Sequence, residues 1–453
     1  MRIRHTVVGA AVLAVTTLSA HPLWAQAPKS SGLKAGAAKV DITPAPNELP
    51  KTYEGVHDRI HSRAIVVENG TTGAVLITVD VGGLSDDTWR NVSQRIEKEL
   101  RIPAANVLIT ATHTHSVPRL GPDLDEKIFQ SAKQAKDSAR PARIGYGTGQ
   151  SFININRNII DPKKGTWWEG PNYEGPSDKT VAVVTFETTE GQPIAVYYNF
   201  AMHAVVLGQL DKVSGDVPGA ASNYIEEAFD NKIVAVWSTG AAGDQNPIFF
   251  QQTYDLREIR VKDYATRGED ISNAMPSGGQ GLNKQDPTVM RLMNQQKQLA
   301  ASMGQFLGEE VRRVMREIDR TSTDGPIYSA QKTVTCPGRE RTNKGRAGIA
   351  GTYKEGPDVN IRLSLLVIDD IAIGGVNAEI FNLIAQRFKR ESPMARTMMA
   401  TITNGRANSG YIPNDAAFGY QTFEVLSSRL QQGCAETAIV DGLIDLMEGA
   451  KKQ

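Results

Sequence analysis

The sequence predicts an α/β fold in which mixed β-sheets are flanked by helices within a single large domain. The first observation is a strand, helix, strand order between residues 74 and 111, which is typical of a β-α-β unit with parallel strands. The second is that apolar runs of strand length alternate with amphipathic helical patterns towards the C-terminus. The third is that the 453 residues contain no internal repeat and no clean linker, which favours one domain.

The first part of the chain supplies the elements of that unit. Ser85 is expected to cap a helix over residues 86–100, with Asp86 and Asp87 in its first turn, and Pro103 closes it. Because the flanking strands are expected to be parallel, their carboxyl ends meet at the sheet edge where ligands bind in such folds. The strands expected here cover residues 37–43, 63–67, 74–79 and 107–111.

The remaining elements follow the same two periodicities. We expect strands at 142–148, 180–186, 194–200, 233–238, 359–368, 371–374 and 398–403, and helices at 125–138, 216–229, 286–319, 378–388 and over most of 427–447. The helix at 378–388 would carry Glu379 in its first turn. Two stretches are predicted to be loops: a Gly-, Pro- and Trp-rich segment between residues 158 and 177, and a polar, Gly-rich segment at 249–285.

Residues 1–27 have the pattern of a secretory signal peptide. Arg2 and Arg4 form a basic start, residues 7–18 an apolar core, and Ala25-Gln-Ala27 a cleavage site. The alternative, an uncleaved anchor helix, is disfavoured because the apolar run is short for a membrane span. We therefore expect cleavage after Ala27, and export of residues 28–453 to a periplasm or to the outside of the cell.

Charge and cysteine content narrow the classes of function. Removing Arg2 and Arg4 from the 50 basic residues leaves 48 against 50 acidic residues, and this balance argues against general nucleic-acid binding. The two cysteines, Cys336 and Cys434, lie in no C-x-x-C motif, so a cysteine metal site is not expected. They could pair in an oxidising compartment, but the sequence leaves that pairing open.

Three histidines follow predicted strands. His113 and His115 come just after the strand at 107–111, and residues two apart in an extended segment face the same way. His203 comes just after the strand at 194–200. One histidine at such a position is more often a hydrogen-bonded structural residue, but three at two strand ends indicate a metal site.

Oxygen donors that could complete such a site lie at other strand ends and helix starts. The candidates are Asp80, Asp244, Glu379 and Tyr411, and the residue pattern alone does not choose among them. A catalytic zinc ion needs about three N and O donors plus an open position. It lowers the pKa of its water to about 7 and polarises a carbonyl.

Small residues at 240–247 follow the strand at 233–238. They would let a substrate approach backbone N–H groups that stabilise an oxyanion, although a plain tight turn is equally consistent. The run lacks the Lys-Ser/Thr pair of a phosphate loop, and the chain has no G-x-S-x-G elbow. A phosphate loop and a Ser-His-Asp hydrolase are therefore both disfavoured.

Six short motifs occur along the chain. They are Ala38-Lys-Val-Asp-Ile-Thr-Pro44, Thr112-His-Thr-His-Ser116, Asn199-Phe-Ala-Met-His203, Gly240-Ala-Ala-Gly-Asp244, Ala378-Glu379 and Ser409-Gly-Tyr411. In their residues and order they resemble the N-terminal catalytic domain of the neutral/alkaline (non-lysosomal) ceramidase family. Each motif alone is weak, but six in the family's order, spread over most of the mature chain, make a fairly specific signal.

The resemblance implies one zinc ion per chain. The ligands carried over by motif are His113, His203, Glu379 and Tyr411. His115 then resembles the histidine that does not bind the metal but polarises the scissile carbonyl or transfers a proton. The other residues expected to be catalytic are Arg157, Asp244 and Asn246. By resemblance, the reaction is attack of zinc-activated water on an amide carbonyl, which releases an amine and a carboxylic acid.

Three departures from the family pattern bear on the substrate. Asn246 stands where the family usually has serine; asparagine can donate a hydrogen bond to an oxyanion but cannot be a nucleophile, so only the zinc-water mechanism survives. A further active-site tyrosine, expected after Tyr411, falls near Phe423, with Tyr420 as a substitute. Residues 28–453 are expected to form the catalytic domain without the C-terminal β-sandwich domain of full-length ceramidases.

We therefore predict an exported, zinc-dependent amidohydrolase that cleaves the N-acyl amide bond of a ceramide-like or other N-acyl substrate. One alternative is a zinc hydrolase of the same fold that acts on a non-lipid amide or ester, and another is a catalytically silent binding homologue. The expected partner is a small-molecule or lipid N-acyl substrate, with peripheral membrane contact but no nucleic acid. The oligomeric state is not predicted.

Overall fold

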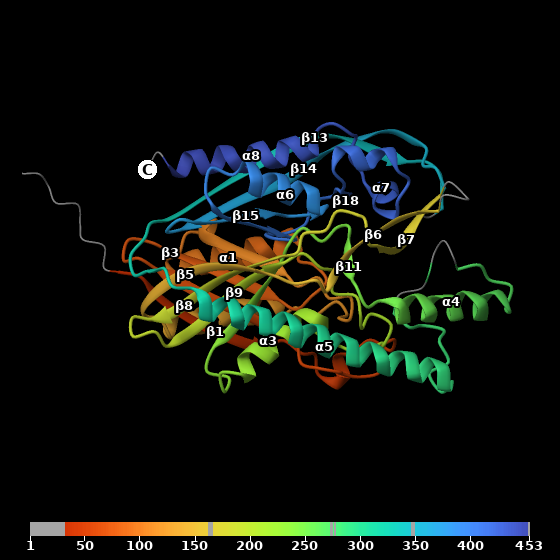
Figure 1. Cartoon of the computed structure of the whole chain (residues 1–453), viewed down its shortest axis with the longest axis horizontal. Helices are drawn as coiled ribbons and strands as arrows, with labels where there is room; N and C mark the ends of the chain where they lie inside the picture. The colour runs from red at the N-terminus through yellow and green to blue at the C-terminus, as the bar shows by residue number, and fades with distance from the viewer. Residues whose placement is uncertain (1–31, 162–165, 272–274, 276–277, 346–348, 452–453) are drawn as a thin grey trace, which may run out of the picture.

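The structure is a computed structural model that describes residues 32–161, 166–271, 275, 278–345 and 349–451. The predicted signal peptide lies outside these residues. Two β-sheets pack face to face between two sets of helices, so the described chain has four layers (Figure 1). This arrangement confirms the predicted α/β fold with mixed sheets flanked by helices.

The larger sheet carries the strands that lead to the histidines. Its strands are β1 (Lys34–Asp41), β2 (His61–Glu68), β3 (Gly73–Val79), β4 (Val107–Ala111), β5 (Arg140–Gln150), β8 (Thr180–Thr188), β9 (Pro193–Phe200), β10 (Val234–Thr239) and β12 (Thr321–Ser322). Their order is β10-β9-β8-β5-β1-β2-β3-β4, with β12 beside β5. The pairs β3–β4 and β9–β10 are parallel and the other neighbours are antiparallel.

The second sheet and two short ladders come from the later and middle parts of the chain. The second sheet contains β13 (Ile327–Arg341), β14 (Tyr353–Ile368), β15 (Ile371–Val376) and β17 (Arg396–Thr401), in that order. One small sheet joins β11 (Gln245–Pro247), β6 (Asn154–Asp161) and β7 (Thr166–Asn172). A two-stranded ladder joins β16 (Glu379–Ile380) to β18 (Tyr411–Ile412).

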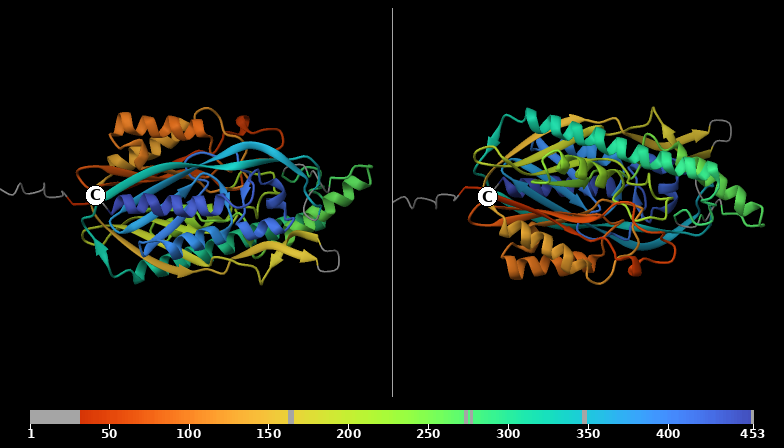
Figure 2. Two further views of the ribbon diagram at one scale, coloured as in Figure 1. Left: turned by 90° about the horizontal axis from the view of Figure 1, so that it is seen from above. Right: turned by 90° about the horizontal axis from the view of Figure 1, so that it is seen from below.

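The helices cover the two outer faces of the sheets, as Figure 2 shows from above and below. They are α1 (Asp86–Leu100), α2 (Leu124–Asp137), α3 (Asp216–Glu227), α4 (Gln251–Ala265), α5 (Pro287–Glu317), α6 (Asn382–Glu391), α7 (Phe423–Ser427) and α8 (Ala435–Ala450). Helices α1, α2, α3 and α5 pack on the larger sheet, and α6 and α8 pack on the second. Strand β4 is buried along its whole length because both of its faces are covered.

Most expected elements are present with small changes at their ends. Ser85 caps α1 as predicted, accepting a hydrogen bond from the Thr88 N–H at 3.0 Å. Val92, Ile96 and Leu100 form the buried face of that helix. The parallel β3–β4 pair on either side of α1 confirms the predicted β-α-β unit.

Three predictions about local structure are wrong. The expected loop at 249–285 contains α4, whose few buried residues form no apolar stripe that a sequence pattern could reveal. The stretch after residue 158 forms the β6–β7 hairpin, and β13, a polar strand, was not predicted. Glu379 lies in β16 rather than in a helix, because its backbone pairs with β18 and α6 begins only at Asn382. The prediction that most of 427–447 is helical is confirmed by α8, which a short break separates from α7.

Cys336 of β13 and Cys434, which precedes α8, form a disulfide with a Cα–Cα distance of 5.8 Å. The pairing that the sequence left open is therefore made, and it ties the second sheet to its covering helix. Among the helices of the described residues, none combines the length and apolar character that crossing a bilayer requires.

Candidate metal centre and active site

The strand ends that carry the three histidines are joined directly. Thr114 and Ala204 form a parallel bridge between the segments that follow β4 and β9. The His115 N–H donates to the Ala204 carbonyl at 3.0 Å, which reinforces the join. One ligand atom from each of His113, His115 and His203 lies within 4.8 Å of the others. The structure thus brings together the three histidines that the sequence singled out.

Glu379 reaches the same place from the second half of the chain. Its Oε2 lies 3.1 Å from His113 Nε2 and 3.4 Å from His203 Nε2. The other ring nitrogens face backbone carbonyls: His113 Nδ1 is 2.6 Å from Gly82 O, and His203 Nδ1 is 3.2 Å from Gln245 O. A carbonyl only accepts, so Nδ1 carries a hydrogen in both rings and Nε2 is the atom directed at Glu379.

The pKa values indicate a carboxylate that faces two imidazoles of different basicity. Burial alone would raise the pKa of Glu379, but the facing imidazoles hold it well below its usual range, so Glu379 is a carboxylate. Burial lowers the pKa of His113, yet the Glu379 carboxylate outweighs burial and raises it. Burial and the charge of Arg157 lower the pKa of His203 to about 4, so this ring is neutral.

A metal ion fits this donor set. The neutral His203 directs Nε2 at a carboxylate, and this buried nitrogen has no hydrogen-bond partner. Zinc bonds of 2.0–2.1 Å in a tetrahedral site place donor atoms about 3.3 Å apart. The distances from Glu379 to His113 and His203, 3.1 and 3.4 Å, match that spacing.

His115 is the exposed member of the histidine group. Its Nε2 lies 3.3 Å from His113 Nε2. Desolvation by the surrounding protein and the imidazoles of His113 and His203 hold the pKa of His115 well below its usual value. His115 therefore stands as a neutral imidazole beside the candidate ligands, where solvent or a substrate can reach it.

Tyr411 lies next to this group. Its ring centroid is 6.3 Å from that of His203, and burial raises its pKa above the usual value. The guanidinium carbon of Arg157 is 5.3 Å from the Tyr411 ring centroid. Phe423, at the position near which a second tyrosine was expected, packs on Tyr411 with centroids 5.6 Å apart. Tyr420, its possible substitute, is 43% exposed and stacks on Trp167.

Arg157 and Asn246 hold each other in a buried network. Arg157 donates from Nε to Glu424 Oε1 at 2.5 Å, from Nη1 to Asn246 Oδ1 at 3.3 Å and from Nη2 to Gly243 O at 2.7 Å. Asn246 donates from Nδ2 to Glu169 Oε1 at 2.9 Å. The amide of Asn246 is therefore engaged by protein groups on both its oxygen and its nitrogen.

Asp244 connects the 240–247 turn to α6. Its carboxylate accepts from the Asn382 N–H at 2.9 Å, from Asn382 Nδ2 at 2.6 Å and from Asn156 Nδ2 at 3.1 Å. Burial raises its pKa to about 6. N–H groups of the turn bond to other backbone, including Gly243 to Ile380 O at 2.8 Å. These contacts favour a structural turn, and a catalytic role for Asp244 stays a prediction.

Asp80, the remaining oxygen-donor candidate, is engaged elsewhere. It lies 3.1 Å from Arg63 Nη1 and accepts from the His61 N–H at 2.8 Å. Burial raises the pKa of Asp80 above its usual value. Both partners of Asp80 therefore come from β2 and not from the donor set around Glu379.

Sequence reasoning missed Glu424 and Glu169, the two carboxylates linked to Arg157. Glu424 lies in the first turn of α7, and Glu169 lies in β7. Neither belongs to a motif or to an apolar period, and each acquires its role through contacts with distant segments. Glu169 lies in the segment that was predicted to be a loop, so its side chain had no assigned direction.

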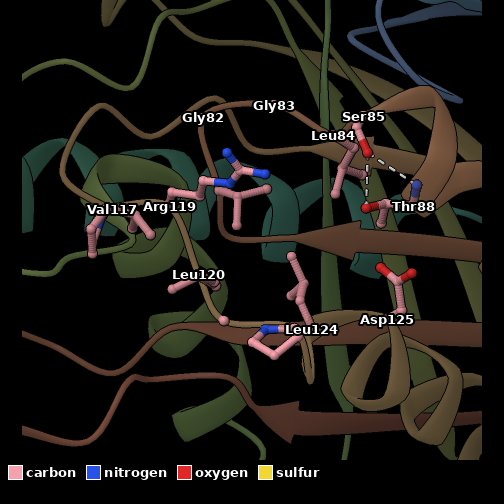
Figure 3. Close-up of a pocket in the computed structure, with 14 residues that line it drawn as sticks. Gly82, Gly83, Leu84, Ser85, Thr88, Val117, Arg119, Leu120, Leu124 and Asp125 are labelled. Carbon is pink, nitrogen blue, oxygen red and sulfur yellow. Dashed lines mark hydrogen bonds between the residues drawn. The ribbon is translucent and has the colours of Figure 1, made fainter. Parts of the chain in front are cut away.

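A cavity of about 780 Å³ is lined in part by Gly82 (Figure 3), the residue whose carbonyl accepts from His113 Nδ1, and none of the candidate ligands lines it. Its apolar lining comes from the segments before α1 and α2, and includes Val81, Leu84, Val117, Leu120 and Leu124. Arg119, Ser85 and Asp125 add polar groups to the wall (Figure 3). The loop after the Thr-His-Thr-His run thus forms one side of this cavity.

The fold and this convergent set of two imidazoles and a carboxylate define an α/β protein with a metalloenzyme-like centre. A sequence model of the family described as neutral/alkaline non-lysosomal ceramidase, N-terminal, matches residues 124–364. The chain belongs to this family.

Named relatives are similar over part of their length. A neutral ceramidase of Pseudomonas aeruginosa is 27% identical over 286 residues, which cover 53% of this chain and 42% of the relative. A neutral ceramidase of Drosophila pseudoobscura pseudoobscura is 24% identical over 256 residues, which cover 48% and 36%. The match therefore spans about two fifths or less of these relatives.

Solved structures confirm the fold over nearly the whole chain. The crystal structure of neutral ceramidase from Pseudomonas aeruginosa gives a TM-score of 0.69 at 17% identity, covering 93% of this chain and 75% of that one. A structure described as ceramidase complexed with C2 gives the same TM-score and coverage at 15% identity. At such identities the likeness concerns the fold.

Proposed function

We propose that this chain is an exported, zinc-dependent amidohydrolase that cleaves the N-acyl amide bond of a ceramide-like or other N-acyl substrate. The observation that carries the proposal is the convergence of His113 Nε2 and His203 Nε2 on Glu379 Oε2. Membership of the ceramidase family supports the reaction class. When bound, zinc would polarise the amide carbonyl and lower the pKa of a bound water to about 7.

The protein groups have separate tasks in this proposal. The residues that would hold the metal are His113, His203, Glu379 and Tyr411. His115, beside them and exposed, would hydrogen-bond the carbonyl oxygen or pass a proton to the departing nitrogen. Arg157 would hold Tyr411 in place from the buried side. The C–N bond breaks and a C–O bond forms with water, which gives an amine and a carboxylic acid.

The substrate class is proposed as N-acyl compounds, of which ceramide is one member. The apolar cavity beside Gly82 would accommodate part of an acyl chain or another apolar group. A second candidate, a zinc hydrolase of a non-lipid amide or ester, is favoured by one observation. Asn246 replaces the family's serine and its amide is already engaged by Arg157 and Glu169, so contacts to a ceramide would differ.

Export is supported by the signal pattern at residues 1–27 and by the Cys336–Cys434 disulfide, because such bonds persist mainly in oxidising compartments. A secreted or periplasmic enzyme would meet lipid substrates at a membrane surface, which accounts for the proposed peripheral contact.

The test combines metal analysis with a substrate panel. Purified wild-type protein, His113→Ala and the matched control His57→Ala are assayed for bound zinc and for hydrolysis of N-acyl amides, ceramide and simple esters. We expect one zinc per chain and amide cleavage in the wild type and in His57→Ala, and loss of both in His113→Ala. Cleavage of esters alone would favour the second candidate. Absence of stoichiometric zinc, or full activity of His113→Ala, would overturn the mechanism.

A further inference from the structure

Arg157 places a buried positive charge beside the candidate metal ligands. The residue is 4% exposed, and its guanidinium faces the Tyr411 ring. A buried positive charge this close to the candidate ligands repels a divalent cation that binds among them. A negative charge next to Arg157 is therefore needed to balance the guanidinium.

Glu424 balances Arg157 directly. Its Oε1 accepts from Arg157 Nε at 2.5 Å, and its side chain is only 1% exposed. A charge-assisted bond in such a dry setting both neutralises the guanidinium and fixes the plane of its three nitrogens. The guanidinium carbon then lies 5.3 Å from the Tyr411 ring centroid, and Nη2 donates to the Gly243 carbonyl.

Glu169 acts on the same guanidinium through Asn246. Its Oε1 accepts from Asn246 Nδ2, which directs Asn246 Oδ1 towards Arg157 Nη1. Its Oε2 lies 2.8 Å from Arg257 Nη1 of α4. Burial would raise the pKa of Glu169, but Arg257 and Arg157 lower it to about 2, so Glu169 is a carboxylate at neutral pH.

We propose that Glu424 and Glu169 are positioning residues for the metal centre, which neutralise and orient Arg157 so that Tyr411 is held in place and a divalent cation can bind beside a guanidinium. This inference rests on the proposed function only in taking zinc as the metal. It assigns a role to two carboxylates that lie outside the donor set itself. Groups behind a first ligand set commonly change metal affinity or activity by about 10–100-fold when they are removed.

The experiment measures zinc affinity of the metal-free full chain by competition with a chromogenic chelator. The variants are Glu424→Gln, Glu169→Gln, Arg157→Gln and the double variant Glu424→Gln/Arg157→Gln. We expect Glu424→Gln to weaken zinc binding by about 10–100-fold. Glu169→Gln should have a smaller effect of the same sign, because Asn246 stands between its carboxylate and Arg157.

The double variant separates this role from a general structural one. If Glu424 acts through Arg157, then Glu424→Gln should change zinc affinity by less than about threefold in the Arg157→Gln background. An equal loss in both backgrounds, or wild-type affinity in Glu424→Gln, would overturn the proposal. Should Glu424→Gln fail to fold, Glu169→Gln is compared in the wild-type and Arg157→Gln backgrounds by the same criterion, since the Glu169 side chain is 21% exposed.

The control variant is Glu187→Gln, which removes a carboxylate paired with Arg143 between β8 and β5. It should bind zinc as the wild type does. The outcome is independent of the substrate panel, because zinc affinity is read without substrate. If the effects of Glu424→Gln and Arg157→Gln on zinc affinity are coupled but no amide is cleaved, the proposed function is wrong and this inference holds. If amides are cleaved but the two effects are not coupled, the proposed function holds and this inference is wrong.

Discussion

Glu379 and Tyr411 are direct partners in a two-residue parallel ladder. Paired residues on neighbouring strands project their side chains to the same face, so the ladder sends a carboxylate and a phenol in one direction. The ladder is tied to the 240–247 turn, because the Gly243 N–H donates to the Ile380 carbonyl at 2.8 Å. Two candidate ligands from distant parts of the sequence are therefore fixed in one frame.

The first prediction concerns Glu379 and Tyr411 as candidate metal ligands. Glu379→Gln keeps the shape of the side chain and removes its charge, so zinc affinity should fall by more than the roughly 10–100-fold typical of residues behind the ligands. Tyr411→Phe should cause a smaller loss, because one neutral oxygen donor is removed. Chelator competition measures both, with Tyr173→Phe at an exposed position as the control. Unchanged zinc binding in Glu379→Gln would show that Glu379 is not a ligand.

The second prediction concerns Asp244. Its two oxygens accept three N–H groups from Asn382 and Asn156, and Asp244→Asn would replace one acceptor by a donor facing other donors. Leaving such buried groups unpaired should lower the free energy of unfolding by about 1–3 kcal/mol. Urea unfolding measures this, with the exposed Asp137→Asn as a control that should change it little. A stable but inactive Asp244→Asn would instead support the predicted catalytic role.

The histidines could be found from the sequence because strand ends leave a local signal. An apolar run of strand length followed directly by a histidine identifies both the element and the side that its end faces, and this holds for His113 and His203. That these two ends meet does not follow from the sequence, because β4 and β9 are not neighbours in the sheet and it is the Thr114–Ala204 bridge that joins the segments beyond them. The position of Glu379 in a ladder does not follow, since two residues of strand carry no period and α6 begins three residues later.

Glu424 and Glu169 could not be found from strand ends or from apolar periods. Each is an isolated acid whose partner, Arg157 or Asn246, is brought to it by tertiary packing alone. The same reason explains α4, a helix without an apolar stripe, which takes its place from contacts with α5. The choice of Tyr411 among the oxygen-donor candidates came from the family resemblance, because the residue pattern alone did not choose among them.

The third prediction is a pH dependence from Asp216. Burial raises the pKa of this carboxyl from 3.8 to about 6. Between these values the folded protein holds a proton that the unfolded chain has lost, so this group's contribution to stability is full below about pH 4 and is lost as pH rises to about 6. Asp216→Asn should therefore remove roughly 3 kcal/mol from the pH-dependent change in the free energy of unfolding. Urea unfolding at pH 4, 5, 6 and 7 gives the comparison, and an identical slope in the variant would contradict it.

The fourth prediction concerns the disulfide. Cys336 and Cys434 are separated by 98 residues, so their bond restricts a long loop in the unfolded chain. The double variant Cys336→Ala/Cys434→Ala should lose about 2–4 kcal/mol of unfolding free energy. Zinc binding should persist, because the bond joins β13 to the start of α8 and not the candidate ligands. Denaturation with and without reductant checks this: reductant should destabilise the wild type and leave the double variant unchanged.

The last prediction concerns Asn246. Asn246→Ser removes the bridge between Arg157 and Glu169 and should cost about 1–3 kcal/mol of unfolding free energy. Asn246→Asp keeps the size but places a second carboxylate next to Glu169 in a buried site, where like charges repel. Its cost should therefore be larger, on the order of 3 kcal/mol or more.

The pair Asn246→Asp/Glu169→Gln tests the cause of that loss. Removing the charge at position 169 takes away the repulsion, so the double variant should recover at least half of the stability that Asn246→Asp loses. Urea unfolding of the two single variants and the double variant gives the coupling between the sites. Simple addition of the two single losses would mean that Asn246 and Glu169 do not share a hydrogen bond in solution, and Arg157 would then have to be oriented by Glu424 alone.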